Sequence, residues 1–126
     1  MGTTSSKTQM LDQARAAHAW ATVQQVLRQK DSDKKDFVTQ AKKFPTRIMT
    51  SGLGQAVAFL EAKGYAKDMG DRLGDWINQR RPSPQKQKLL HRIIHEDADF
   101  LRFATAESLA YLQWLGRFAE AELKTD

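Results

Sequence analysis

The chain has 126 residues, a formal net charge of +5 and no cysteine. This length favours one domain, 1–126, that buries a core without cross-links, and the lack of cysteine excludes disulfides and thiolate metal sites. No apolar run is long enough to cross a membrane, and the polar first residues do not resemble a signal peptide. We therefore expect a cytoplasmic protein with no membrane partner, in which residues 1–6 are flexible.

The excess of positive charge, with an isoelectric point of about 9.6, favours a polyanionic partner. Nucleic acid is the main candidate. A soluble protein that is basic without any such partner is the alternative.

Helix signals cover almost the whole chain, because prolines are few and no β-branched segment alternates with period two. The first predicted helix covers 7–29. Its small and apolar residues recur at helical spacing, and we expect this stripe to face the core: Met10, Ala14, Ala17, Trp20, Ala21, Val23 and Leu27. Four polar residues lie off the stripe: Asp12, Arg15, Thr22 and Gln25.

A charged turn follows, and a second helix is predicted from Lys34 onward. Ser32 or Asp33 can serve as its N-cap, because their side chains accept hydrogen bonds from free backbone amides. Pro45 lacks a backbone donor and restricts the residue before it, so it should stop or kink this helix.

Gly52-Leu53-Gly54 lies beside basic residues and raises the question of a phosphate-binding loop. A dinucleotide fingerprint needs a third glycine where Val57 stands, and a P-loop needs a lysine where Gln55 follows Gly54. Both patterns fail, so we predict a corner between two helices. Gly52 would take the left-handed conformation that ends the first of them.

Four more predicted segments complete the chain. A helix over 53–63 ends at Gly64, a typical C-cap, and a helix over 65–81 carries Gly70 and Gly74. Ser83 can cap a helix that begins at Pro84 and buries Leu89, Leu90, Ile93 and Ile94. The last helix, 98–124, is apolar around most of its girth, which is typical of the centre of a bundle. The predicted fold is therefore all-α, a single compact bundle of about five to six helices with a long, central C-terminal helix.

The "HRIIHED" segment presents two histidines on one helical face. His91 and His95 have a spacing that can hold zinc, but Arg92 stands where a metalloprotease helix needs glutamate, and no third ligand is evident. We predict no metal, no cofactor and no catalytic residue. A metal-dependent helical enzyme using His91 and His95 remains an alternative. Glu107 lies on the aromatic face of the last helix, where we expect it to accept from an arginine or a backbone amide.

Two stretches of the chain contain clustered cations and no acidic residue. The first flanks Pro45 and contains Lys42, Lys43 and Arg47. The second lies between Trp76 and His95 and contains Arg80, Arg81, Lys86, Lys88 and Arg92. Clustered cations of this kind favour contacts to a phosphate backbone. Arg15 on the first helix is a further nucleic-acid-binding candidate.

Two segments, "FPTRIMTSGLGQAVAFL" and "FLRFATAESLAYLQWLGRFAEA", resemble a known family. They are similar to the small helical subunit of the type III-B CRISPR effector, the fifth Cmr protein. "RAAHAW" in the first helix resembles the opening helix of the same family, so the similarity spans most of the chain.

The resemblance implies a small all-helical protein without enzymatic activity, in antiviral defence. Copies would stack on one another as a filament beside the backbone and large subunits, and their basic surface would contact guide RNA and target RNA. Cleavage of target RNA would belong to a backbone subunit. A protein-interaction bundle whose basic face is incidental is the remaining alternative.

Overall fold

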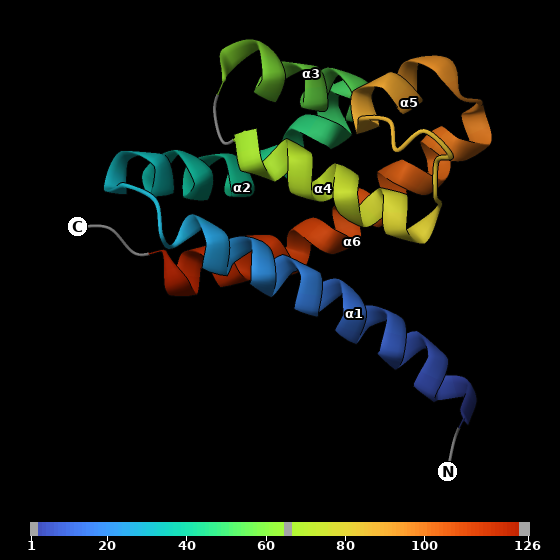
Figure 1. Cartoon of the computed structure of the whole chain (residues 1–126), viewed down its shortest axis with the longest axis horizontal. Helices are drawn as coiled ribbons and strands as arrows, with labels where there is room; N and C mark the ends of the chain where they lie inside the picture. Colours follow the sequence, from blue (N-terminus) through green and yellow to red (C-terminus); the bar gives the residue numbers. More distant parts are fainter. Residues whose placement is uncertain (1–2, 65–66, 124–126) are drawn as a thin grey trace.

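Six α-helices make up the part of the chain that the computed structural model describes, residues 3–64 and 67–123 (Figure 1). They are α1 (Thr3–Val26), α2 (Asp31–Ser51), α3 (Leu53–Lys63), α4 (Lys67–Arg80), α5 (Leu89–His95) and α6 (Ala98–Glu122). No strand occurs within these ranges, so the all-α prediction is confirmed. Tyr65 and Lys124, the predicted ends of two helices, lie outside the described residues. The single domain and the flexibility of residues 1–6 stay predictions.

The long last helix, α6, is central, as its apolar girth predicts. It packs against α1, α2, α3 and α4. Its fully buried residues include Ala104, Tyr111, Leu115 and Ala119. α3 and α5 pack on each other and on α4, on the far side of the bundle from α1 (Figure 1). Asp97 caps α6, because its side chain accepts from the backbone amide of Phe100 at 3.0 Å.

α2 runs through Pro45, contrary to the prediction that this proline stops or kinks a helix. Proline removes the hydrogen bond that would end on the carbonyl of Ala41. Buried Phe44 and Ile48 on either side hold the helix in place. Gly116 of α6 lies against the freed carbonyl, since a Cβ there would lie 3.8 Å from the Ala41 oxygen. Tertiary packing therefore outweighs the local cost of the proline.

Two predicted helix starts are wrong. α2 has Lys30 as its N-cap, in place of Ser32 or Asp33. No helix begins at Pro84, because α5 begins at Leu89. The segment before α5 is held as a turn, in which the amide of Lys86 donates to the Ser83 carbonyl at 3.0 Å. Asn78 of α4 donates to the Gln87 carbonyl, also at 3.0 Å. In a longer α5, that carbonyl would be used by the backbone hydrogen bonds of the helix itself.

The glycine corner between α2 and α3 is present as predicted. Gly52 has φ +88° and ψ 158°, so it uses the positive φ that side chains resist, but not the left-handed helical conformation expected for it. Its amide donates to the Ile48 carbonyl at 2.8 Å and ends α2. Gly64 does adopt the left-handed conformation, with φ 69° and ψ 11°, and ends α3 as predicted.

The face that α1 buries is not the predicted one. Met10 is 63% exposed, Trp20 is 42% exposed, and Ala14, Ala17, Ala21 and Leu27 are also at least partly exposed, so of the predicted stripe only Val23 is buried. The buried face instead contains His18, Ala19, Thr22, Val23 and Val26. Polar residues turn inward because partners on α4 and α6 satisfy their hydrogen bonds. Ile94 of α5, also predicted to be buried, is 65% exposed.

Candidate nucleic-acid interface

The cluster around Pro45 lies on α2 and faces solvent in part. Lys42 and Lys43 are exposed. Lys42 Nζ lies 3.6 Å from a carboxylate oxygen of Glu120 on α6, and both side chains are more than half exposed, so this pair is weak. Lys43 has no acidic partner among the described residues. These two ammonium groups are therefore accessible to a phosphate.

Arg47 of the same cluster has intramolecular partners. Its Nη1 donates to the Gln40 side chain at 2.8 Å, and its guanidinium lies 3.8 Å from the centre of the Phe59 ring. The residue is half-buried. One edge of the guanidinium is thus occupied, and its face packs on Phe59 of α3.

The second cluster starts at the C-terminal end of α4, where Arg80 and Arg81 share one aromatic ring. Their guanidinium carbons lie 5.3 and 4.2 Å from the centre of the Phe103 ring. Arg80 donates to Glu107, whereas Arg81 makes an exposed ion pair with Asp99 at 3.2 Å. Arg81 is therefore the more accessible of the two.

Lys86 and Lys88 lie in the irregular segment between α4 and α5, and both are exposed. Lys88 Nζ lies 3.8 Å from Glu61 of α3, an exposed and weak pair. Lys86 has no acidic partner among the described residues and has φ 49°, unusual for a residue with a side chain.

Arg92 does not offer its charge to the surface. The residue is only 3% exposed, and its guanidinium donates to Glu96 at 2.5 Å, to Asn78 at 2.7 Å and to the Arg81 carbonyl at 2.6 Å. It also lies 4.2 Å from the centre of the Phe100 ring. The geometry therefore makes Arg92 a bridge between α4, α5 and α6 and argues against a phosphate contact.

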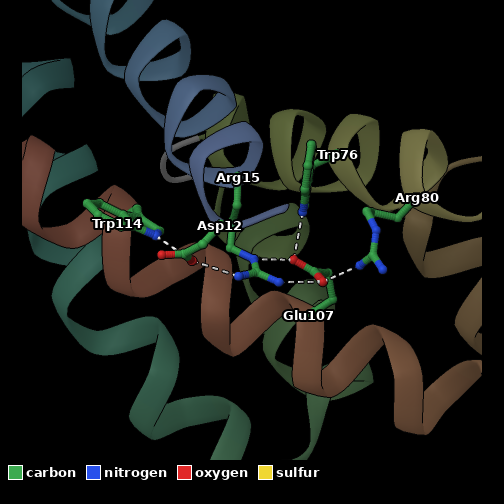
Figure 2. Close-up of polar contacts among 6 residues, drawn as sticks. All are labelled: Asp12, Arg15, Trp76, Arg80, Glu107 and Trp114. Carbon is green, nitrogen blue, oxygen red and sulfur yellow. Dashed lines mark hydrogen bonds and ion pairs between the residues drawn. The ribbon is translucent and has the colours of Figure 1, made fainter. Parts of the chain in front are cut away.

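Arg15 is occupied in the same way, within the cluster that Figure 2 shows around Glu107. Arg15 Nε and Nη2 donate to the two Glu107 oxygens at 2.5 and 3.0 Å, and its Nη1 donates to Asp12 at 2.8 Å. Glu107 also accepts from Arg80 and from the Trp76 indole, the latter at 2.8 Å. The expectation that Glu107 accepts from an arginine is confirmed, and Glu107 accepts from a second arginine, Arg80, as well.

The carboxyl of Glu107 is ionised despite its burial. Burial alone would raise its pKa, but the hydrogen bonds from Arg15 and Trp76 and the positive charges of Arg15 and Arg80 outweigh that effect and hold the pKa below its ordinary value. The hydrogen bond to Glu107 correspondingly raises the pKa of Arg15. This cluster joins α1, α4 and α6, and it occupies Arg15 fully and Arg80 in part.

A second buried polar chain lies one turn along α1. His18 Nε2 lies 2.7 Å from Asp75, and Nδ1 lies 2.7 Å from the Tyr111 hydroxyl. Thr22 lies 3.0 Å from the same hydroxyl and accepts from Arg72 at 2.9 Å. Burial raises the pKa of Tyr111 to about 12, so its hydroxyl stays protonated. A neutral His18 that donates to Asp75 and accepts from Tyr111 satisfies both ring nitrogens.

We expect the free energy of unfolding to decrease as the pH falls below about 6.5. Burial lowers the pKa of His18 below its ordinary 6.5, although Asp75 opposes the shift, so the unfolded chain binds this proton more readily than the folded one. The stabilisation is full above pH 6.5 and is lost as the pH falls through 6.5 toward the folded pKa. Urea unfolding at pH 7.5 and pH 5.5 measures it, and His18→Gln should reduce the difference.

The control for this pH dependence is the double variant His91→Gln, His95→Gln, which removes the other two histidines of the chain. Both residues are exposed on α5. If this double variant abolished the pH dependence and His18→Gln did not, the role assigned to His18 would be wrong.

His91 and His95 lie together on α5, with ring centres 4.3 Å apart. Within 3–64 and 67–123, no three His, Cys, Asp or Glu side chains gather in a way that could hold a metal ion. The histidine pair therefore has no third protein ligand in the described part of the chain.

Comparison with known proteins gives the family. A family model described as "CRISPR-associated protein (Cas_Cmr5)" matches residues 11–122, nearly the whole chain. The chain belongs to the Cmr5 family. It is therefore a Cmr5 subunit of the type III-B CRISPR complex, which confirms the resemblance seen in the sequence.

A solved structure agrees with this Cmr5 assignment at the level of the fold. It is the X-ray crystal structure of a CRISPR-associated Cmr5 family protein from Thermus thermophilus. The two structures match with a TM-score of 0.76 at 24% sequence identity, over 90% of this chain and 97% of the other. In the part of this Cmr5 chain that the structure describes, no helix is both long and apolar enough to traverse a bilayer.

The Cmr5 fold also brings forward a cation that the sequence pattern did not single out. Arg117 is exposed on α6, one turn before Glu120, the partner of Lys42. α2 and α6 pack together. We call Lys42, Lys43 and Arg117 the α2–α6 basic surface. Arg117 was missed because it is distant in sequence from the lysines and has acidic neighbours, and only the pairing of α2 with α6 could have found it.

Proposed function

We propose that this chain is a non-catalytic, cytoplasmic Cmr5 subunit that stacks with further copies and holds the guide–target RNA duplex by its phosphates. The observation that carries the RNA contact is the α2–α6 basic surface, where Lys42 and Lys43 are exposed and have at most one weak acidic partner among the described residues. Ammonium groups of this kind bind phosphates without reading bases. In an RNA-guided complex, base pairing supplies the sequence specificity.

Arg81, Lys86 and Lys88 support a second phosphate contact, because they are exposed and their acidic partners, where present, are exposed too. Arg47 and Arg80 have part of their donors occupied, so we assign them a supporting role. Arg15 and Arg92 are left out of the proposal, since both guanidinium groups are buried in ion pairs.

Replacement of Lys42 and Lys43 by alanine should weaken binding of target RNA by the assembled complex. Removal of one phosphate contact should reduce the steepness of log K against log salt by about 0.7–0.9, hence by about 1.5 for the pair. The measurement is the retention of labelled target RNA by the complex at salt concentrations from about 50 to about 300 mM, from which the slope of log K against log salt is obtained.

The matched control is Lys30→Ala with Lys35→Ala, which removes the same charge from positions at the start of α2. It should leave the salt dependence nearly unchanged. If the Lys42, Lys43 variant behaved like this control while assembly stayed intact, the phosphate contact assigned to the α2–α6 basic surface would be wrong.

A further inference from the structure

His91 and His95 on α5 are used neither by the fold nor by the proposed RNA contact. Both side chains are exposed, and their ring centres lie 4.3 Å apart with the ring planes tilted by 45°. Within 3–64 and 67–123, neither ring has a hydrogen-bond or ion-pair partner, whereas both ring nitrogens of buried His18 have one. The nitrogens of the exposed pair are therefore free to bind a ligand from outside.

The spacing of the pair suits a chelate. Residues four apart on a helix lie one turn apart on the same face. Imidazole nitrogens bind zinc at about 2.0–2.1 Å, so two of them on one ion lie about 3 Å from each other. Rings whose centres are 4.3 Å apart reach this separation by rotation of their side chains, which their exposure permits. The two imidazoles can thus bind one ion without a change in the backbone of α5.

The helix that carries the pair is held in place from its buried side. Arg92 donates to the Asn78 side chain of α4 and to the Arg81 carbonyl. Ile93 packs on α3, since a Cβ on Gly54 would lie 3.3 Å from the Ile93 Cγ2 atom. Because α5 is fixed before an ion arrives, binding has little backbone entropy to lose.

The donor set and the nearby charges select the kind of ion. Neutral imidazole nitrogens suit Cu²⁺, Ni²⁺ and Zn²⁺, whereas Mg²⁺ and Ca²⁺ prefer oxygen ligands. The cations nearest to the pair along the chain have carboxylate partners: Arg92 pairs with Glu96, and Lys88 lies 3.8 Å from Glu61. The pair therefore offers nitrogen donors without an unpartnered cation beside them on α5.

We propose that His91 and His95 chelate one divalent ion of the copper, nickel and zinc class, with water in its remaining positions. The sequence predicted no metal because no third ligand was evident, but a chelate completed by water needs none. Catalytic zinc has three protein ligands, so the proposal concerns binding and revives no enzyme. It does not depend on the proposed RNA contact, which uses other residues.

The test is a calorimetric titration of the untagged full chain with NiCl₂. We expect saturable binding of one ion per chain, whereas MgCl₂ should give no saturable binding. Since two imidazoles hold the ion, His91→Gln and His95→Gln should each weaken nickel binding by about tenfold or more. Absence of saturable binding, or full affinity in either variant, would overturn the proposal.

NMR of the histidine ring protons locates the ion in the unmodified chain. Paramagnetic Cu²⁺, added below one equivalent, should broaden the ring resonances of His91 and His95 and leave those of buried His18 sharp. Equal broadening of all three histidines would contradict the assigned site. The Lys42, Lys43 variant should bind nickel normally, so failure of the RNA proposal and failure of this one are distinguishable.

Discussion

Replacement of Glu107 by glutamine should lower the free energy of unfolding by about 3–5 kcal/mol, because one partner of a buried ion pair is removed and the other is left uncompensated. The carboxylate is 5% exposed and accepts from three residues on α1 and α4. Glutamine has nearly the same shape, but it has no charge and its amide group adds donors where Arg15, Trp76 and Arg80 already donate. Urea unfolding followed by circular dichroism at pH 7 measures the loss.

Glu120→Gln is the matched control for this variant. It makes the same chemical change on the same helix, but its side chain is 54% exposed and its ion pair among the described residues is with Lys42, so the free energy of unfolding should change by less than about 0.5 kcal/mol. Equal stabilities of the two variants would contradict the view that the Glu107 cluster holds α1 to the bundle.

The pH dependence gives an independent check on Glu107. Its folded pKa lies below the ordinary 4.5, so the unfolded chain takes up this proton first as the pH falls. The stabilisation is fully present above the ordinary pKa and is lost as the pH falls through 4.5 and then through the lower folded pKa. Below about pH 5, Glu107→Gln should therefore make the free energy of unfolding depend less steeply on pH, whereas the slope near neutral pH should stay the same.

Replacement of Arg92 by methionine should be nearly as costly, at about 3 kcal/mol. Methionine keeps much of the length of the side chain, but it leaves the Asn78 side-chain oxygen and the Arg81 carbonyl without their donor and leaves Glu96 without its partner. Since these groups join α4 to α5, we expect the seven-residue α5 to lose its position first. Chemical denaturation and hydrogen exchange at α5 amides measure this.

Arg81→Met is the control for Arg92→Met. The Arg81 guanidinium lies one residue past α4 and pairs with exposed Asp99. We expect the two variants to show opposite phenotypes. Arg92→Met should lose stability, whereas Arg81→Met should fold normally and weaken RNA retention by the assembled complex. A stable Arg92→Met variant with impaired RNA retention would restore Arg92 to the set of phosphate ligands.

Arg92 and Arg15 show where charge patterns along a sequence stop being informative. The absence of acidic residues near Arg80, Arg81 and Arg92 predicted free cations, yet Glu107 and Asp99 of α6 reach two of them and Glu96 reaches the third. Which cations are free depends on which elements become neighbours. The Arg92–Glu96 pair is four residues apart and could be recognised along the chain, whereas the α6 partners of Arg80 and Arg81 could not.

The buried face of α1 could not be predicted for the same reason. Hydrophobic periodicity selected the stripe of Met10 and the alanines, because an apolar side chain usually faces inward. The opposite face carries Arg15, His18 and Thr22, and it is buried because α4 and α6 supply Glu107, Asp75 and Tyr111 as partners. Polar side chains become good core residues only once those partners exist.

The sequence by itself determined the all-α class, the central last helix, the corner at Gly52, the C-cap at Gly64 and the family. Each of these depends on signals that lie within one segment of the chain: the apolar girth of a helix, the conformations that glycine allows, and the segments that resemble the family. Only the tertiary structure decided that α2 continues through Pro45, that α1 buries its polar side, and that Arg15 and Arg92 serve the fold. These outcomes depend on contacts between residues far apart in sequence, and their free energies exceed the local preferences that oppose them.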